Sequence, residues 1–378
     1  MKAALENIKV LDLTRVLAGP TCIQILGDLG AEVLKVEHPE TPDITRTWGP
    51  PFEEDSDGNP TSESAYYLSC NRNKKSILID FTTPKGKEKL LQLIKSTDVF
   101  VENFKTGTLE KYELGYDEVI KINPNIIYCS ITGFGHTGPF KDKPGYDFQI
   151  QGMSGLMSLN GEPDGTPLRA GISLADISTG VYSALAIMTA LFHRQRTGEG
   201  QFIDMSLFDC QMAMLSFAAQ SFLTDGKQPP RVGNAHPNIV PYGAFPAQDG
   251  HVIIAIGTDD QFRKFCDAVR RPELYTDPRF HKNKDRILHR NILIPLIETI
   301  TYEKTVEEWV QILDGLNIPC GPVNTLEQAF NHPQAIARGF SVPIENLNIV
   351  ASPLRLSKTP PTYRLRPPRH GEHTKEEL

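Results

Sequence analysis

The chain has 378 residues, a formal net charge of −7 at pH 7, 39% hydrophobic residues and 22% charged residues. This length and apolar content suffice for one large domain or two ordinary ones with buried cores. No apolar run approaches the length that spans a bilayer, and the lysines and arginines are scattered along an acidic chain, so we expect neither a membrane protein nor a general nucleic-acid binder.

The cysteines are widely spaced along the chain. They form no Cys-x-x-Cys pair and have no histidine at metal-ligand spacing, so we expect buried thiols in a reducing compartment and no metal site. The folding signal starts at Ile8, which leaves no room for a signal peptide. The chain is therefore predicted to be cytoplasmic, or mitochondrial if a transit segment has been removed. The six cysteines are Cys22, Cys70, Cys129, Cys210, Cys266 and Cys320.

The first third of the chain alternates short apolar runs with helical patterns. A strand at 8–13, a helix at 20–29 and a strand at 32–37 form a βαβ unit. Further strands are predicted at 76–81, 99–102 and 126–131, with a helix at 84–95. Such alternation predicts an α/β, Rossmann-like domain in which helices cover a mostly parallel sheet.

Polar residues follow several of these strands. In parallel sheets ligands bind at the carboxyl ends of the strands, and these ends meet at one edge. We therefore expect four loops to converge on one crevice. They are Thr14-Arg15, Glu37-His38, Asn103-Phe104 and Thr132-Gly133.

Helical patterns dominate residues 146–223, interrupted by a turn at 198–200 and a strand-like segment at 201–205. The composition then shifts to glycine, proline, asparagine and histidine over residues 224–247, which is typical of a linker or a binding loop.

A second, smaller α/β domain is predicted beyond this linker, from a strand at 251–257, a helix at 260–270 and two more helical stretches up to residue 316. The tail from Gly339 is irregular, with a helix beginning where the chain stops. The predicted organisation is a large domain at 1–225, a linker and small domain at 226–330, and a C-terminal return to the large domain at 331–378.

One carboxylate, Asp176, stands among small and apolar residues in P-L-R-A-G-I-S-L-A-D-I-S-T-G (167–180). The segment 177–196 carries apolar residues at helical spacing, so Asp176 is predicted in the first turn of a long buried helix. Two interpretations stay open: Asp176 caps the helix, or it is a poorly hydrated, reactive carboxylate. The apolar residues of the helix are Val181, Leu185, Met188, Leu191 and Phe192.

Other motifs exclude several enzyme classes. The first loop, T-R-V-L-A-G-P, lacks the G-x-G-x-x-G fingerprint of a nicotinamide or flavin enzyme. The Gly-rich loop 133–139 lacks the Lys-Ser/Thr ending of a P-loop and indicates a mobile lid or a turn. No serine, cysteine or aspartate stands in a G-x-S-x-G context, so a serine or cysteine hydrolase has no support, although His136, His236, His370 and His373 could act as bases.

The run Asn71-Arg72-Asn73-Lys74-Lys75 puts three cations in five residues just before a strand. Such a run is typical of a solvated turn. Its position in the sheet also allows a phosphate clamp.

The chain resembles the class III coenzyme A transferases, a family that also contains formyl-CoA:oxalate CoA-transferase, carnitine CoA-transferase and 2-methylacyl-CoA racemase. The resemblance covers nearly the whole chain, and T-R-T-W-G-P-P-F and Y-Y-L-S-C-N-R-N-K-K-S-I look most like members that use dicarboxylates, notably succinyl-CoA:glutarate CoA-transferase. The motifs that carry it include L-D-L-T-R-V-L-A-G-P, G-D-L-G-A-E-V-L-K-V-E, V-F-V-E-N-F, G-F-G-H-T-G-P, L-A-D-I-S-T-G, I-P-C-G-P-V-N and G-E-H-T.

The resemblance implies that Asp176 is a nucleophile. Its carboxylate would attack the thioester of an acyl-CoA, and an enzyme-bound aspartyl-CoA thioester would follow a mixed anhydride. An incoming carboxylic acid would then leave as its own CoA ester. No permanent cofactor is implied, because coenzyme A enters as acyl-CoA substrate. The family also implies an interlocked homodimer.

The resemblance further implies CoA contacts at positions that match the family. The chain departs from the family pattern at Arg15 and Leu17 in the first loop and at His38 after the second strand. Gly233 and His236, in the 224–247 segment, are expected to face the acyl group. The expected contacts are Arg15, Ala18, His38, Asn71, Arg72, Asn73, Lys74, Asn103, Phe104, Lys111 and Tyr146.

A dicarboxylate substrate would need a partner for its second carboxylate. Arg46, Arg169 and His236 are candidates, since arginine binds carboxylates through a bidentate fork, but each could equally form a structural ion pair.

Two alternatives to the transferase stay open. The racemase uses a histidine from a G-H-D segment, and the matching residues here are Gly145, Tyr146 and Asp147; tyrosine is a poor base near neutral pH. The other alternative is a non-catalytic CoA-ester-binding protein, against which the presence of Asp176 speaks.

Overall fold

The computed structural model describes residues 3–55 and 57–378, which divide into two compact units. Unit 1 comprises Met1–Leu156, Arg169–Leu223 and Gln334–Leu378, and unit 2 comprises Met157–Leu168 and Thr224–Pro333. The predicted division placed 157–168 in the large domain. In the structure this segment belongs to unit 2 and is joined to the linker by a hydrogen bond from the Gly233 amide to the Gly161 carbonyl.

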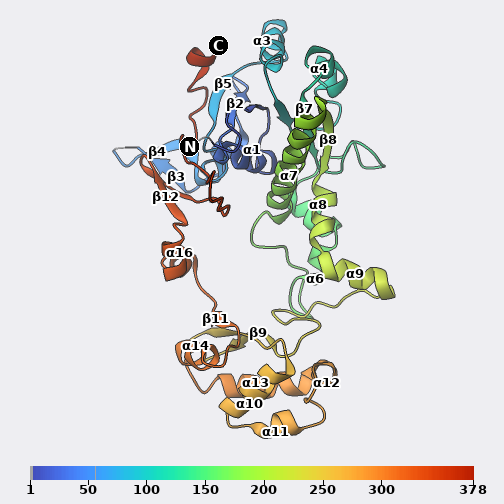
Figure 1. Cartoon of the computed structure of the whole chain (residues 1–378), viewed down its shortest axis with the longest axis vertical. Coiled ribbons are helices and arrows are strands. Elements are labelled where there is room, and N and C mark those ends of the chain that lie inside the picture. Colours follow the sequence, from blue (N-terminus) through green and yellow to red (C-terminus); the bar gives the residue numbers. More distant parts are fainter. Residues whose placement is uncertain (1–2, 56) are drawn as a thin grey trace. The chain divides into compact units, whose positions relative to one another are not determined.

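A six-stranded parallel sheet forms the centre of unit 1, in the order β5-β2-β1-β6-β7-β8, which confirms the α/β fold class (Figure 1). The chain runs outward from β1 in one direction through β2 and β5, and in the other through β6, β7 and β8. The loops after β1 and β6 therefore flank the switch point, where doubly wound sheets bind their ligands. The strands are β1 Lys9–Asp12, β2 Glu32–Glu37, β5 Lys75–Leu78, β6 Val99–Glu102, β7 Ile127–Thr132 and β8 Gln201–Ser206.

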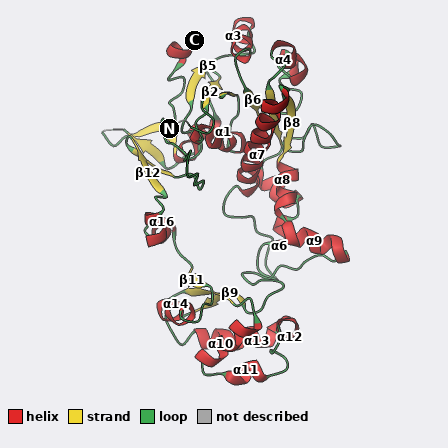
Figure 2. Ribbon diagram, in the orientation of Figure 1, coloured by secondary structure: helices red, strands yellow, loops and turns green. Residues whose placement is uncertain are grey.

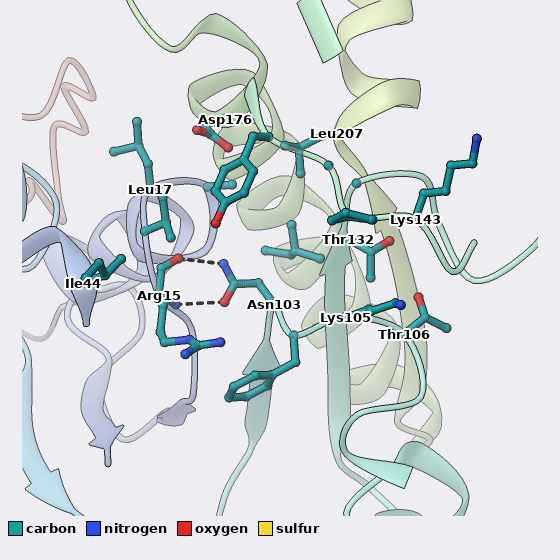
Figure 3. Close-up of a pocket in the computed structure, with 18 residues that line it drawn as sticks. Arg15, Leu17, Ile44, Asn103, Lys105, Thr106, Thr132, Lys143, Asp176 and Leu207 are labelled. Carbon is teal, nitrogen blue, oxygen red and sulfur yellow. Dashed lines mark hydrogen bonds between the residues drawn. The ribbon is translucent and has the colours of Figure 1, made fainter. Parts of the chain in front are cut away.

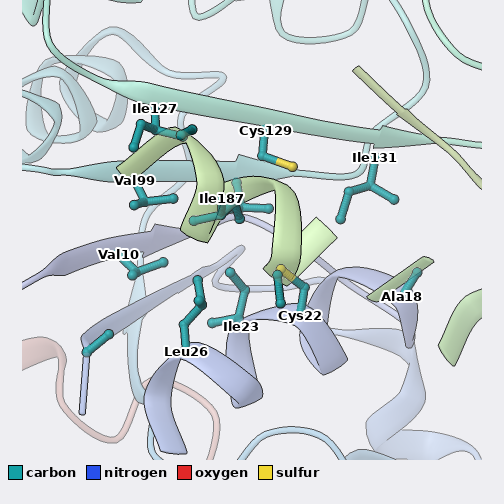
Figure 4. Close-up of a cluster of buried hydrophobic side chains, with 14 of the residues drawn as sticks. Val10, Ala18, Cys22, Ile23, Leu26, Val99, Ile127, Cys129, Ile131 and Ile187 are labelled. Carbon is teal, nitrogen blue, oxygen red and sulfur yellow. The ribbon is translucent and has the colours of Figure 1, made fainter. Parts of the chain in front are cut away.

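Both faces of the sheet are buried, as parallel sheets require. Val10 and Leu11 are neighbours on β1 and point to opposite faces. On one face, α1 (Ala18–Asp28) and α7 (Leu174–Thr197) supply Ile23 and Ile187 to the same apolar cluster as Val10 (Figure 4). On the other face, Leu11 belongs to a second cluster with residues of α3 (Pro84–Ile94) and α4 (Tyr116–Ile122).

Helix α7 packs closely on α1. A Cβ atom added at Gly180 would lie 2.7 Å from the Ala18 carbonyl oxygen, so only glycine permits this approach. This contact fixes the position of α7, and therefore of Asp176, relative to the loop that precedes α1.

The predicted long buried helix is buried on one side only, since Val181, Leu185 and Phe192 of the apolar pattern are exposed. The buried side of α7 is made of smaller residues, among them Ala184 and Ala190, which let α1 and the sheet approach. Within the described residues α7 is also the one helix long and apolar enough to cross a bilayer, contrary to the sequence expectation. More than half of that window (56%) is buried inside the protein, as in a core helix.

Several elements of unit 1 escaped the sequence analysis. The tail that was expected to be irregular contains the hairpin β12 (Ser341–Ile344) and β13 (Leu347–Val350), and a second hairpin joins β3 (Phe52–Glu54) to β4 (Pro60–Ser64). The other helices of this part of the chain are η1 Ile44–Thr47, α2 Ala65–Leu68, η2 Glu110–Tyr112, α5 Asp147–Met153, α6 Leu156–Leu159, α8 Leu207–Met214, α9 Ser216–Asp225, α16 Pro333–Ala337 and α17 Thr374–Glu377.

Unit 2 has a three-stranded antiparallel sheet, in the order β11-β10-β9, against which helices pack (Figure 2). Its core contains Phe262, Phe265 and Trp309, all almost fully buried. Its elements are β9 Tyr242–Pro246, β10 His251–Ala255, α10 Asp259–Ala268, α11 Pro272–Thr276, α12 Asn283–Leu288, α13 Arg290–Thr301, α14 Val306–Asp314, β11 Cys320–Pro322 and α15 Leu326–Phe330.

Candidate active site

A cavity of about 280 Å³ lies in unit 1 at the carboxyl ends of β1, β6 and β7 (Figure 3). The loops after these strands meet here, as predicted. The loop after β2 lines a smaller cavity of about 130 Å³ instead, and Arg15 and Phe104 belong to both cavities. The larger cavity is lined by Arg15, Val16, Leu17, Ala18, Ile44, Asn103, Phe104, Lys105, Thr106, Ile131, Thr132, Gly133, Lys143, Pro144, Gly145, Tyr146, Asp176 and Leu207.

The loop after β1 is fixed by hydrogen bonds to its backbone. The Asn103 side chain accepts from the Arg15 amide at 2.8 Å and donates to the Arg15 carbonyl at 2.6 Å, as Figure 3 shows. Val16 has a left-handed backbone (φ 69°), and its amide donates to the carboxylate of Asp43, which is paired in turn with buried Lys35. A non-glycine residue is held in that conformation only when its surroundings determine it. The first wall of the cavity is therefore built in advance of any ligand.

Asp176 lies in the first turn of α7 and is 8% exposed. Burial raises the pKa of its carboxyl to about 7, and the negative charge of Asp147 adds to this rise. A carboxylate that is ionised only near neutral pH is a stronger base and nucleophile than an ordinary aspartate.

The capping interpretation of Asp176 is wrong, because Asp147 of α5 caps the helix. Its Oδ1 accepts from the amides of Ala175 (2.8 Å) and Asp176 (3.3 Å). The other amides of the first turn are also occupied: Leu174 donates to the Ile172 carbonyl and Ile177 to the Ser173 carbonyl. No amide of this turn is left for the Asp176 side chain.

Gln151 extends this clamp by one turn of α5. Its Nε2 donates to Asp147 Oδ2 at 2.7 Å, and its Oε1 accepts from the Ala170 amide at 2.9 Å. The two side chains thus hold the segment that leads into α7 at both ends. The i, i+4 spacing of an acid and an amide after Tyr146 was the signal for this pair, and the sequence analysis did not use it.

The predicted CoA contacts fall into three groups. Arg15, Ala18, Asn103, Phe104 and Tyr146 line the larger cavity, and His38 lines the smaller one. Lys111, on η2, is exposed and lines neither. The sequence analysis missed two further cations of the larger cavity, Lys105 and Lys143.

For the third group, Asn71 to Lys74, the prediction of CoA contacts is wrong. These residues form neither a solvated turn nor a phosphate clamp. All four are buried and bound within the protein. Lys74 is fully buried and pairs with Asp12 at 3.1 Å. Asn71 accepts a hydrogen bond from Lys74 and donates one to the Tyr67 carbonyl.

The other two members of this run bind helix α1 and the returning C-terminal segment. Arg72 pairs with Asp28 at 2.6 Å, and Asn73 bonds to Asp28 as well as to Thr362 and Arg364. Arg72 and Asn73 therefore attach the C-terminal segment to α1.

The prediction that Arg46 binds a substrate carboxylate is also wrong, because its guanidinium forms structural ion pairs within the protein. It is 2% exposed, and its guanidinium binds Glu37, Glu63 and the Tyr67 hydroxyl. Arg169, in contrast, is exposed, with its guanidinium 5.8 Å from the Phe148 ring centroid. Arg169 stays a prediction, as do Gly233 and His236, which belong to unit 2.

The Gly-rich loop 133–139 contains a turn that hydrogen bonds attach to β7 and β8. The His136 amide donates to Asp204 at 3.0 Å, the Gly135 amide donates to Thr132, and the His136 ring is 2.7 Å from the Ser130 hydroxyl. His136 is therefore engaged on the sheet and does not line either cavity.

The fold and site define a class of protein: a doubly wound α/β protein with a buried, basic carboxylate at the switch point of its sheet. Comparison with known families is more specific. Residues 5–374 match the profile of CoA-transferase family III, and the chain belongs to this family.

Curated relatives carry CoA-transferase names. The chain is 45% identical to the succinate–glutarate CoA-transferase of Agrobacterium fabrum, over 100% of this chain and 95% of that protein. It is 41% identical to the human succinyl-CoA:glutarate CoA-transferase, over 98% of this chain and 84% of that protein. The acetyl-CoA:oxalate CoA-transferase of Acetobacter aceti is 37% identical, over 94% of this chain and 90% of that protein.

Solved structures agree. The crystal structure of a CaiB/BaiF family protein from Brucella suis superposes with a TM-score of 0.90 at 45% identity, and covers 100% of this chain and 98% of that one. The crystal structure of a Mycobacterium tuberculosis protein superposes with a TM-score of 0.89 at 29% identity, and covers 100% and 99%. The protein is thus a CoA-transferase of family III.

Asp147→Asn tests the electrostatic part of this site. Asparagine keeps an oxygen for the α7 amides and removes the negative charge, so the pKa of Asp176 should fall. In the wild type we expect kcat/KM to rise with pH through about 7, as Asp176 ionises. In the variant this acidic limb should move to lower pH while remaining above the ordinary range, because burial is the larger cause of the shift.

Gln151→Met is the matched control. It removes the hydrogen bond that Gln151 Nε2 donates to Asp147 and leaves the negative charge of Asp147 in place. Its acidic limb should not move to lower pH. An Asp147→Asn profile that coincides with that of the wild type would contradict the assignment.

Proposed function

We propose that the protein transfers CoA from succinyl-CoA to a dicarboxylate such as glutarate, through a covalent aspartyl-CoA intermediate on Asp176. The observation that carries the proposal is the buried carboxylate of Asp176, which lines the cavity at the sheet's switch point and has a pKa raised by burial to about 7. The names of the most similar relatives support this substrate pair.

The charges that line the larger cavity suit an anionic substrate. Among the described residues that line it, Arg15, Lys105 and Lys143 are cations and Asp176 is the one carboxylate. Acyl-CoA carries phosphates and a dicarboxylate carries two negative charges, so both are attracted to such a surface. Arg15 and Phe104 connect this cavity with the smaller one, and we infer that the nucleotide end of CoA occupies the smaller cavity beside His38.

The proposed chemistry needs no group beyond the substrates and the carboxylate. An Asp176 oxygen attacks the thioester carbon, the C–S bond breaks, and CoA leaves as thiolate, which gives a mixed anhydride. The thiolate then attacks the aspartyl carbonyl and succinate leaves. Glutarate attacks the resulting aspartyl-CoA thioester, and CoA thiolate, released once more, attacks the glutaryl carbonyl and frees Asp176.

The surroundings of Asp176 suit such an exchange. Leu17, Ala18 and Leu207 line the cavity together with it and are themselves buried. Apolar walls limit the access of water, which would hydrolyse the anhydride or the thioester and leave a hydrolase instead of a transferase.

The exchange reaction tests the proposal. With succinyl-CoA as donor and glutarate, oxalate, malate, itaconate and carnitine as competing acceptors, we expect glutaryl-CoA or another dicarboxylyl-CoA, measured by mass spectrometry. Asp176→Ala should abolish the product, because no other residue provides the nucleophile. Exchange that persists in Asp176→Ala would contradict the role of Asp176, and carnitine as the sole acceptor would contradict the dicarboxylate substrate class.

We propose also that two chains form a homodimer. Both α7 and α9 carry several exposed apolar side chains, and exposed apolar surface is typical of an interface. These side chains are Val181, Leu185, Phe192, Phe217, Phe222 and Leu223.

Sedimentation equilibrium tests the dimer. We expect the mass of two chains for the wild type and a shift toward one chain for Leu185→Glu, since a buried charge at an interface is strongly unfavourable. Leu288→Glu changes a leucine outside α7 and α9 that is more exposed than Leu185, and it should keep the mass of the wild type. A monomeric wild type would refute the dimer.

A further inference from the structure

The loop after β6 supports one wall of the larger cavity. Asn103 and Phe104 line this cavity, and the Asn103 side chain binds the Arg15 backbone on both sides. The guanidinium of Arg15 lies over the Phe104 ring, 4.7 Å from its centroid. The shape of this loop therefore sets the position of Arg15, which lines both cavities.

Glu102, the last residue of β6, holds this loop. Its Oε2 accepts from the Phe104 amide at 2.8 Å, and its side chain is buried, with the residue only 5% exposed. Other buried acids of the sheet, Asp12 and Glu37, are paired with cations, whereas Glu102 has no ion-pair partner among the described residues. A buried carboxylate without a cation is costly, and such groups are typical of functional sites.

A row of polar side chains continues from Glu102 across the sheet. In the strand register Glu102 is paired with Ser130 of β7, and Ser130 with Asp204 of β8. Paired residues of neighbouring strands point to the same face, so the Ser130 hydroxyl lies beside the Glu102 carboxyl. Ser130 is fully buried, and its Oγ is 2.7 Å from His136 Nε2. Ser130 therefore lies between a buried acid and a half-buried imidazole.

The Ser130 hydroxyl has one proton, so it donates to only one of these two neighbours at a time. When Glu102 is ionised, Ser130 donates to the carboxylate and accepts from the Nε2 proton of His136. When Glu102 is protonated, its carboxyl donates to Ser130, and Ser130 donates to His136. The ionised form of Glu102 is thus supported by a donor that is already in place.

The charge of Glu102 changes near neutral pH. Burial raises the pKa of its carboxyl to about 7, the charge of Glu110 adds to this rise, and the hydrogen bonds from Ser130 and the Phe104 amide oppose it. A hydrogen bond to an ionised acceptor is about twice as strong as one to a neutral acceptor. The Phe104 amide is therefore held more strongly when Glu102 is ionised.

The other titratable groups beside this row have different roles. Burial raises the pKa of Tyr128 and of Cys129, both on β7, and the charge of Glu102 adds to each rise, so both stay neutral. Asp204 of β8 accepts from the His136 amide. Glu102 is therefore the group of this row that both binds the cavity loop and changes charge near neutral pH.

We propose that Glu102 is a positioning residue for acyl-CoA, whose ionised carboxylate holds the Phe104 amide and with it the wall of the larger cavity. When Glu102 is protonated, the loop that fixes Asn103 and Arg15 is held less strongly, and CoA binds more weakly. Affinity for CoA is therefore full above the pKa of Glu102 and is lost as the pH falls through about 7. The inference rests on the proposed function, which places acyl-CoA in this cavity.

The dissociation constant of CoA, measured by calorimetry, tests the inference. The Asp176→Ala protein is used, because it lacks the titration of Asp176. We expect Kd to rise about 3- to 10-fold from pH 8 to pH 6, the difference between a charge-assisted and a neutral hydrogen bond. Adding Glu102→Gln keeps the shape of the side chain and removes its charge, so Kd should be raised already at pH 8 and should rise less toward pH 6.

The titration of the CoA phosphates is common to both proteins, so the comparison isolates Glu102. An equal Kd and an equal pH profile in the two proteins overturn the inference and leave the proposed function standing. A protein that binds no CoA at either pH, with Asp176 present or replaced, contradicts the proposed function and this inference together.

Two substitutions outside the cavity separate a role of this charge from a merely structural role. Ser130→Ala removes a hydrogen bond that lowers the pKa of Glu102, so the pH at which CoA affinity falls should move upward. Glu110→Gln, at an exposed position of η2, removes a charge that raises this pKa and should move it downward. Cys129→Ala, next to Ser130 but on the other face of β7, is the matched control and should not move it. Shifts that are absent, or that have the same direction in Ser130→Ala and Glu110→Gln, overturn the inference.

Discussion

The carboxylate of Asp147 at the start of α7 is the interaction on which the site depends. By accepting from the amides of Ala175 and Asp176 it leaves the Asp176 side chain without a backbone partner. A carboxylate that accepted these amides would have a lowered pKa and would be a poor nucleophile. Burial and the charge of Asp147 act in the opposite direction and raise the pKa of Asp176. One acid caps the helix so that the other can react.

Buried ion pairs hold the loops around this carboxylate. Lys74 pairs with Asp12 at the end of β1, and Lys35 pairs with Asp43, which binds the Val16 amide. Removing one partner of such a pair leaves an uncompensated buried charge and costs about 3–5 kcal/mol. These cations therefore shape the site without facing it, and the anionic substrates are left to Arg15, Lys105 and Lys143 on the cavity wall.

Local patterns predicted much of the fold. Strands β2 and β6 were predicted residue for residue, because an apolar run bounded by polar residues carries the strand signal within itself. The hairpin of β12 and β13 was missed because its strands have only four residues each, and β12 contains a proline. Such a segment is hard to distinguish from an irregular tail. The rule that parallel strands end at one edge of the sheet then predicted that four loops would meet, and those after β1, β6 and β7 do.

The site could be predicted only where the signal was local. Asp176 was found from its apolar surroundings, but its capping role was misjudged because the true cap, Asp147, stands 29 residues earlier. Arg72 was wrongly expected to face a ligand. Its partners, Asp28 and the Val350 carbonyl, lie 44 and 278 residues away in sequence, so no local pattern shows them.

The most direct test of the account is the mass of the protein after incubation with succinyl-CoA in the absence of an acceptor acid. We predict release of succinate and a covalent aspartyl-CoA thioester, which adds the mass of CoA minus that of water, is carried by the peptide that contains Asp176 and is absent from Asp176→Ala. Lack of any adduct under conditions in which the wild type exchanges CoA, or an adduct on a different residue, would contradict nucleophilic catalysis by Asp176.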